Sequence, residues 1–140
     1  MRAVLCGALI LLMVSGCGDK KDKNTLPGCP PPISTVSAGN AQISAQARGG
    51  RYAKLIVVHA KEKSNGAPLR NGKVTIQAEM TCPHFMGPLY LKKLQETSAG
   101  TYKGPYTLVM PGHWDVHITV RSKQGDATTS GLPVDVKSSG

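Results

Sequence analysis

The stretch Gly72–Met80, GKVTIQAEM, decides the fold class, because polar and apolar residues alternate along it. Successive side chains of a β-strand point to opposite faces of the sheet. One face of this stretch would carry the apolar residues Val74, Ile76, Ala78 and Met80. The other would carry the polar residues Lys73, Thr75, Gln77 and Glu79. This pattern predicts a strand that covers a core on one side only.

Short segments of similar character flank this stretch and are separated by turn residues such as Asn71-Gly72 and Ala99-Gly100. We expect further strands within 33–47 and at 52–60, 89–95, 101–110, 114–120 and 132–136. Helical periodicity is not sustained in any of them. Short strands at this spacing are typical of an antiparallel sandwich. The sequence therefore predicts an all-β fold, an immunoglobulin-like antiparallel β-sandwich of about seven strands.

The N-terminal segment has the features of an export signal. Arg2 precedes an apolar run from Ala3 to Val14, too short to cross roughly 30 Å of hydrocarbon as a helix. The residues that follow, Val14-Ser15-Gly16-Cys17, resemble the lipobox of bacterial lipoproteins. The resemblance implies that residues 1–16 are a signal peptide and that Cys17 becomes the lipid-bearing N-terminus. The alternative is an ordinary secretory signal with an incidental cysteine.

Residues 17–32 would then form the lipidated cysteine and a Pro-rich tether, and residues 33–140 the folded domain. Gly18, directly after Cys17, resembles sorting signals for the outer membrane. We therefore expect the protein in the cell envelope, on the periplasmic side of the outer membrane in a Gram-negative organism. The lipid would be its membrane attachment, and the domain is expected to be monomeric.

The net charge favours anionic partners. The chain has 17 Lys and Arg against 8 Asp and Glu, and without Arg2 the net charge is +8. Lipid headgroups fit this charge. Nucleic acid is not an expected partner, because an exported protein rarely meets it and only one Phe and one Trp are present for stacking on bases.

Two blocks resemble the YtkA-like (FixH-related) domain of exported bacterial proteins. They are Gly72–Met86, GKVTIQAEMTCPHFM, and Gly100–Val120, GTYKGPYTLVMPGHWDVHITV, and the resemblance extends over Tyr52–Val136. Members of that family are often lipoproteins or modules of metal-efflux proteins. The resemblance implies a link to copper or another soft metal, although Cys82 stands where the family is expected to have Met or Gly.

Donor side chains for such a metal gather in both blocks. Met80, Cys82, His84 and Met86 alternate, so an extended segment would project all four to one side. His113 and His117 lie in the second block, as does Met110. Thioethers and thiolates select Cu(I), and imidazole accepts either copper state. His84 and Met86 are the strongest candidates, because the sequence assigns them no packing role.

Structural roles compete with metal binding at these positions. Met80 and Met110 continue inward-facing series and are expected in the core, as is Trp114. His113 and His117 share the outward face of their strand with Asp115, where histidines are most often solvated. His59 ends a buried strand and is expected to have a structural role.

The cysteines leave two alternatives open. Once Cys6 is removed with the signal peptide and Cys17 is lipidated, Cys29 and Cys82 remain as a pair. In an oxidising compartment they can form a disulfide, which excludes Cys82 as a metal ligand but leaves His84 and Met86 free.

No catalytic motif with the required spacing is present, so we do not expect an enzyme. The sequence supports two functions. One is an envelope binding module that handles copper or another soft metal. The other is a metal-free module for protein interaction or envelope assembly, braced by a disulfide.

Overall fold

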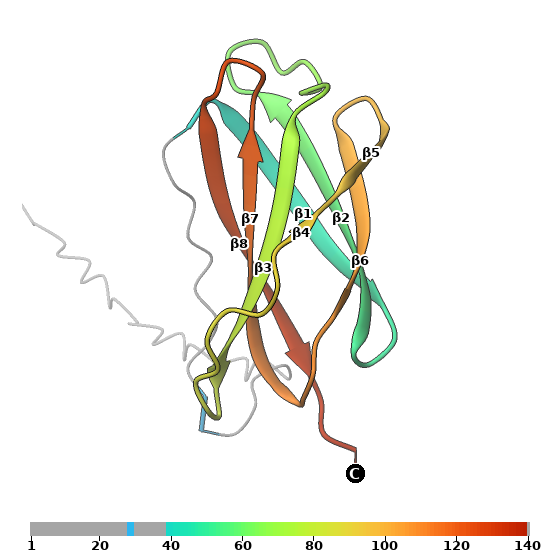
Figure 1. Cartoon of the computed structure of the whole chain (residues 1–140), viewed down its shortest axis with the longest axis vertical. Helices are drawn as coiled ribbons and strands as arrows, with labels where there is room; N and C mark the ends of the chain where they lie inside the picture. The colour runs from blue at the N-terminus through green and yellow to red at the C-terminus, as the bar shows by residue number, and fades with distance from the viewer. Residues whose placement is uncertain (1–27, 30–38, 140) are drawn as a thin grey trace, which may run out of the picture.

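The computed structural model describes residues 28–29 and 39–139. The expected signal peptide, Cys17 and most of the tether lie outside the described residues. Eight strands make up the domain (Figure 1). They are β1 (Ala41–Gly49), β2 (Ala53–Glu62), β3 (Lys73–Cys82), β4 (Lys92–Lys93), β5 (Gln95–Ser98), β6 (Thr101–Thr107), β7 (Gly112–Arg121) and β8 (Ala127–Val136). No helix capable of spanning a membrane occurs among the described residues.

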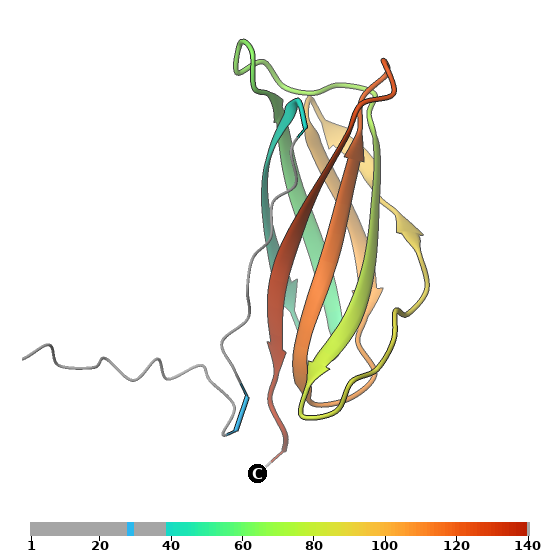
Figure 2. The same ribbon diagram turned by 90° about the vertical axis from the view of Figure 1, so that its left-hand side faces the viewer.

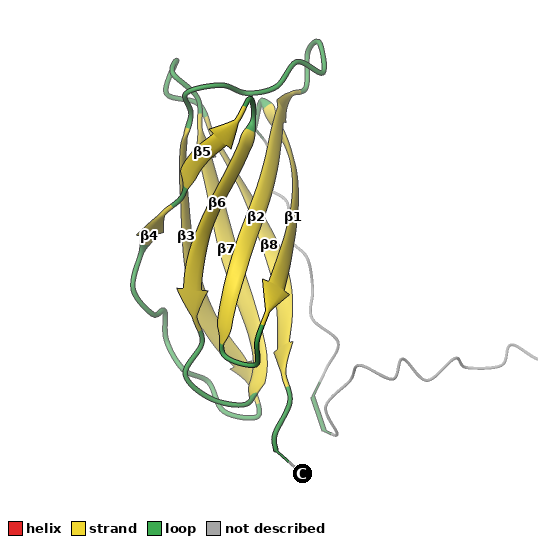
Figure 3. Ribbon diagram, turned by 90° about the vertical axis from the view of Figure 1, so that its right-hand side faces the viewer, coloured by secondary structure: helices red, strands yellow, loops and turns green. Residues whose placement is uncertain are grey.

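The strands form two antiparallel sheets that pack face to face (Figure 3). One sheet has the order β1-β2-β6-β5, and the other has the order β4-β3-β7-β8. These orders match the two sheets of an immunoglobulin domain, with β4 as an additional strand beside the third. The predicted all-β sandwich is confirmed, with eight strands where about seven were expected.

The additional strand arises because the segment expected as one strand at 89–95 divides in two at Leu94. β4 pairs with β3, whereas β5 pairs with β6 in the opposite sheet. Leu94 is 2% exposed, and its backbone N–H donates to the carbonyl of Val74. A Cβ on Gly104 would lie 2.7 Å from Leu94 Cδ2, so the absence of a side chain there makes room for Leu94. The chain thus changes sheets where a leucine can enter the core.

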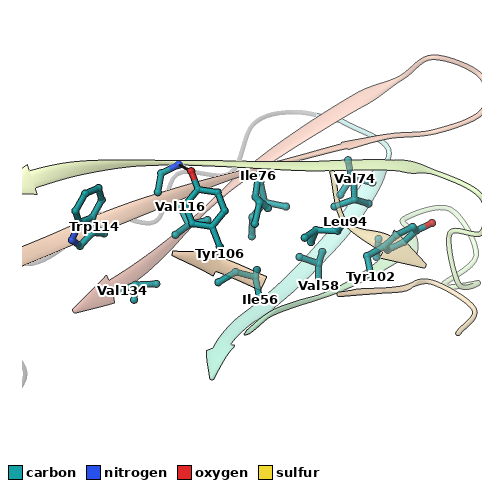
Figure 4. Packing of buried hydrophobic residues seen from close by; sticks show 14 of the residues in the cluster. Ile56, Val58, Val74, Ile76, Leu94, Tyr102, Tyr106, Trp114, Val116 and Val134 are labelled. Atoms are coloured by element: carbon teal, nitrogen blue, oxygen red, sulfur yellow. Dashed lines mark hydrogen bonds between the residues drawn. The ribbon is translucent and has the colours of Figure 1, made fainter. Parts of the chain in front are cut away.

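The core lies between β3 and β7 on one side and β2 and β6 on the other (Figure 4). The four apolar residues expected to face inward from β3 are at most 1% exposed, as are Trp114, Val116, Ile118 and Val120 of β7. β3 and β7 therefore direct their apolar residues into the core, as the alternation in the sequence predicts. Two tyrosines of β6 complete the core. The Tyr106 hydroxyl accepts from Ala78 N–H and donates to the Tyr90 carbonyl, so its buried oxygen is paired.

Several strands begin or end at one end of the sandwich (Figure 2). This end is called the disulfide end, because Cys82 at the end of β3 is disulfide-bonded there to Cys29. It consists of the β1–β2 turn (50–52), the start of the β3–β4 connection (83–89), the β6–β7 loop (108–111) and the C-terminal residues 137–139. Two hydrogen bonds join these segments: Leu108 N–H donates to the Tyr52 carbonyl, and Arg51 Nε donates to the Lys137 carbonyl.

Candidate functional site

Cys29 and Cys82 form a disulfide at the disulfide end of the sandwich. Their Cα atoms are 5.8 Å apart, and 53 positions separate them in the sequence. Of the two alternatives that the sequence offered for Cys82, the structure contains the disulfide. The bonded sulfur is not available as a thiolate ligand, so Cys82 does not contribute to a metal site in this state.

A β-bulge separates Cys82 from Met80. Met80 pairs with Trp114 and Cys82 pairs with His113, with a shift in register between the two pairs. Trp114 and His113 are neighbours in β7 and point to opposite faces, so Met80 and Cys82 also face opposite sides. The expectation that residues 80, 82, 84 and 86 project to one side is therefore wrong. Thr81 is the extra residue of the bulge, and the alternation of residue types in the sequence does not predict it.

The chain after Cys82 folds back on β3. Met80 and Met86 exchange two backbone hydrogen bonds, of 3.1 and 3.0 Å between nitrogen and oxygen. Directly paired residues place their side chains on the same face, so Met86 joins Met80 on the inward side. Met86 packs against the core, and the expectation that it has no packing role is wrong. His84, at the turn between them, is exposed.

Met80 and Trp114 occupy the core as expected, whereas Met110 is only half-buried at its edge. Met110 is nonetheless close to Trp114, because the indole Nε1 donates to the Met110 carbonyl at 3.1 Å. His59 is half-buried, and its Nδ1 lies 3.1 Å from Thr101 Oγ1, which agrees with a structural role.

His113 is buried and not solvated, so its expected exposure is wrong. Only 2% of the residue is exposed, and Nδ1 pairs with the Asp135 carboxylate. The reason is the position of β7 between β3 and β8, which brings Cys82 and Asp135 to either side of His113. A buried imidazole needs a partner for its N–H, and Asp135 supplies it.

The neighbouring positions on the outer face of this sheet hold a cluster of three ionisable side chains, Glu79, Asp115 and His117. His117 Nε2 lies 2.9 Å from Glu79 Oε1, and its Nδ1 lies 3.8 Å from Asp115 Oδ2. The His117 side chain is 43% exposed, whereas the Asp115 side chain is only 18% exposed. The predicted outward face is thus correct for Asp115 and His117, and Glu79 of β3 completes the group.

Asp115 is the electrostatically perturbed member of this cluster. Burial raises the pKa of its carboxyl group above the ordinary 3.8; the nearby His117 lowers it, and Glu79 raises it further. Asp115 Oδ1 is buried without a hydrogen-bond partner. A Cβ on Gly131 would lie 2.9 Å from that oxygen, so the carboxylate would have to shift to accommodate a side chain there. A carboxyl group with a raised pKa is a common property of functional sites, although structural clusters show it too.

Local sequence does not identify Glu79 and Asp135 as the partners of the two histidines. Glu79 lies on the predicted outward face of its strand, but its register with Asp115 is a long-range property of the sheet. Asp135 lies outward on β8 between Val134 and Val136, and this alternation is the signal that could have placed it opposite an outward histidine.

The six predicted metal donors do not converge. Cys82 is disulfide-bonded, His84 is exposed, His113 pairs with Asp135, and His117 lies on the outer face with Glu79. Within residues 28–29 and 39–139, no group of three or more His, Cys, Asp and Glu side chains could hold a metal ion. The predicted set therefore does not fit one metal site, and the structure brings together only the Met80–Met86 pair.

A hollow at the end opposite the disulfide contains none of these donors. It lies beside the β2–β3 and β7–β8 connections and is lined by Asn40, Glu62, Lys63, Ser122, Asp126 and Thr128, among others. Its ionisable side chains are Glu62, Lys63 and Asp126, and no histidine or cysteine lines it.

Comparison with family models, curated proteins and solved structures finds no match to this chain. The YtkA-like resemblance stays a prediction.

Proposed function

We propose that this protein is an exported, lipid-anchored binding module of the cell envelope, with a structural disulfide and a protein partner. The Cys29–Cys82 disulfide is the observation that carries the proposal. Disulfides persist in oxidising compartments outside the cytoplasm, which supports the export that the N-terminal segment predicts. The bond also removes the only thiol that had been expected to bind metal.

A binding role is favoured over catalysis by the shape of the ionisable cluster. Glu79, Asp115 and His117 lie on the outer face of the sheet, and none of them lines the hollow at the opposite end. Such a face can offer a carboxylate and an imidazole to polar groups of a partner, as many protein interfaces do. We therefore assign the outer face of β3 and β7 as the contact surface for an envelope protein.

The anchoring is tested by labelling cells with a palmitate analogue. The parent chain should carry the label and sediment with membranes, whereas Cys17→Ser should lose both properties. Cys29→Ser is the matched control, since it removes a cysteine but keeps Cys17, the predicted site of lipid attachment. Label on the Cys17→Ser chain, or free thiols at Cys29 and Cys82 in protein from membranes, would contradict the proposal.

The contact surface is tested by photo-crosslinking in cells. A photoreactive residue at Thr119, on the outer face of β7, should yield an adduct of defined mass. Lys103, outward on β6 in the opposite sheet, is the control position and should not yield that adduct. The same adducts from both positions would contradict a specific partner on this face.

Copper binding is a second candidate function, and the Met80–Met86 pair is the observation that favours it. Two thioethers on neighbouring inward positions suit Cu(I) better than harder metals. Replacing each with Leu keeps the volume close to that of Met and removes the sulfur. In a Cu(I) titration against a chelator, Met80→Leu and Met86→Leu should each abolish one-to-one binding, and Met110→Leu is the control. Absence of binding by the parent protein would reject this candidate.

A further inference from the structure

The two ends of the sandwich differ in the side chains that they expose. Among the described residues, the large exposed hydrophobic side chains are Leu55, Phe85, Tyr90, Leu91 and Val109. Phe85 and Val109 lie in loops of the disulfide end and are 75% and 55% exposed. None of the five lies in the connections at the opposite end, which are residues 63–72, 99–100 and 122–126. Exposed apolar groups that gather at one end of a domain indicate a contact with a membrane or a protein.

Tyr90 links the β3–β4 connection to the same end. Its hydroxyl accepts a hydrogen bond from Thr107 N–H, and its ring stacks on Tyr106 with centroids 4.6 Å apart. These contacts hold the connection that carries Phe85 against the end of β6, from which the loop with Val109 begins. The loops containing Phe85 and Val109 lie side by side in both views (Figures 1 and 2).

Basic residues accompany the exposed apolar ones. Arg51 and Lys137 are exposed and adjacent, because Arg51 Nε donates to the Lys137 carbonyl at 2.7 Å. The Arg51 guanidinium also lies 5.3 Å from the centre of the Tyr52 ring. Neither of these contacts neutralises the positive charge of Arg51, because a backbone carbonyl and a tyrosine ring carry no negative charge. Asp135, the acidic residue of β8 near this end, is paired with His113. The surface thus combines apolar tips with positive charge, as interfacial membrane contacts do.

The disulfide attaches the tether closer to one end of the sandwich than to the other. Eleven residues separate Cys17 from Cys29, and a fully extended segment of that length reaches about 40 Å. The disulfide fixes Cys29 to the end of β3, at the disulfide end. The opposite end lies further away by the length of β3, about 30 Å for its ten residues.

We infer that the disulfide end docks on an anionic lipid surface, with Phe85 and Val109 entering the headgroup region and Arg51 and Lys137 facing phosphates. This inference rests on the proposed lipid anchoring. The lipid attaches the chain to the membrane, and the loops orient the sandwich, so that the outer face of β3 and β7 stands along the membrane normal and stays accessible.

The first test uses the full lipidated chain in vesicles of phosphatidylethanolamine and phosphatidylglycerol with brominated acyl chains, which quench nearby indoles. Phe85→Trp should lose emission on bromination, and Lys63→Trp, at the opposite end, should not. Buried Trp114 gives the same background in both. Lack of quenching in Phe85→Trp, as expected if this end contacts a protein, or equal quenching in both variants, would overturn the inference.

The second test separates docking from anchoring by using the Cys17→Ser chain, which has no lipid. It should sediment with phosphatidylglycerol vesicles and not with phosphatidylcholine vesicles. Phe85→Ser should bind about tenfold more weakly, the scale expected for losing one buried aromatic side chain. Leu91→Ser, an exposed position just before β4 in the middle of the sandwich, is the matched control and should bind like the parent. Equal binding to both vesicles, or an equal loss for Leu91→Ser, would overturn docking. Mass spectrometry of the parent chain independently reports whether Cys17 carries lipid.

Discussion

Asp115 combines a buried carboxyl group with an oxygen that has no hydrogen-bond partner. Its pKa in the folded protein is raised above 3.8, mainly by burial. The folded state therefore holds this proton more tightly than the unfolded state does. Stability from this group is present at pH values below 3.8 and is lost as the pH rises through the folded pKa.

We predict that Asp115→Asn is more stable than the parent at neutral pH, because asparagine cannot ionise. The advantage should shrink as the pH falls and disappear below 3.8, where both side chains are neutral. Denaturant unfolding at a series of pH values measures the difference in stability. The measurements below pH 3.8 are the control, because the two proteins should be equally stable there. A variant that is less stable than the parent at neutral pH would show that the negative charge is compensated in the fold.

The pairing of His113 with Asp135 makes a contribution to stability that can also be measured. Asp135→Ala removes the acceptor of a histidine that is 2% exposed. We expect the free energy of unfolding to fall by about 1–3 kcal/mol, the cost of leaving a buried polar group without its partner. Asp126→Ala, at an exposed turn, should change it by less than about 0.5 kcal/mol. Equal changes in the two variants would contradict a specific role for the pair.

The burial of His113 also shows where single-residue prediction stops. Its alternation with Trp114 correctly placed it on the outer face of β7, and outward residues are usually solvated. Its cover comes from Cys82 and Asp135, which are 31 and 22 positions away in the sequence. The alternation gives the face, whereas the exposure depends on neighbours that local sequence does not identify.

At the scale of elements, β3 and β7 were predictable because their alternation is long and continuous. The bulge at Thr81 and the crossing at Leu94 were not. The crossing needs both a leucine that enters the core and a glycine at position 104 that leaves space for it. Because these two residues belong to different segments, the match between them does not appear as a periodic pattern in the sequence. The same limit explains why the four alternating donors after Ala78 were expected to form one set.

The disulfide is the element-scale feature with the largest expected energy. It closes a loop that contains β1, β2 and β3. We predict that Cys29→Ser with Cys82→Ser lowers the free energy of unfolding by up to about 4 kcal/mol, from the loss of chain entropy that the bond removes in the unfolded state. Denaturant unfolding of the double variant, compared with the oxidised parent, measures this, and the reduced parent is the control that should unfold like the double variant. Identical midpoints for the oxidised and reduced parent would contradict it.

At the scale of the whole molecule, the order of strands in both sheets agrees with the immunoglobulin-like fold expected from strand number and spacing. The two sheets share one core, in which residues of β2, β3, β6 and β7 contact each other. A domain with a single shared core is expected to unfold as one unit.

We therefore predict coincident unfolding transitions by two probes. Trp114, the only tryptophan, is 1% exposed and reports on the core, while circular dichroism reports on the strands. Both curves should have the same midpoint in urea. Separate midpoints would show that one sheet persists after the core opens, contrary to a single cooperative unit.

The crossing at Leu94 also bears on whether copies of this protein aggregate. A long unpaired sheet edge can recruit a strand from another chain and start aggregation. Here the sheet edges on the crossing side end in β4 and β5, which have only two and four residues. Edges this short offer few free backbone groups to a neighbouring copy. By moving between sheets halfway along the sandwich, the chain covers part of β3 and part of β6 with strands too short to seed intermolecular pairing, and the connection before β4 occupies more of the β3 edge through its bonds to Ala78 and Met80.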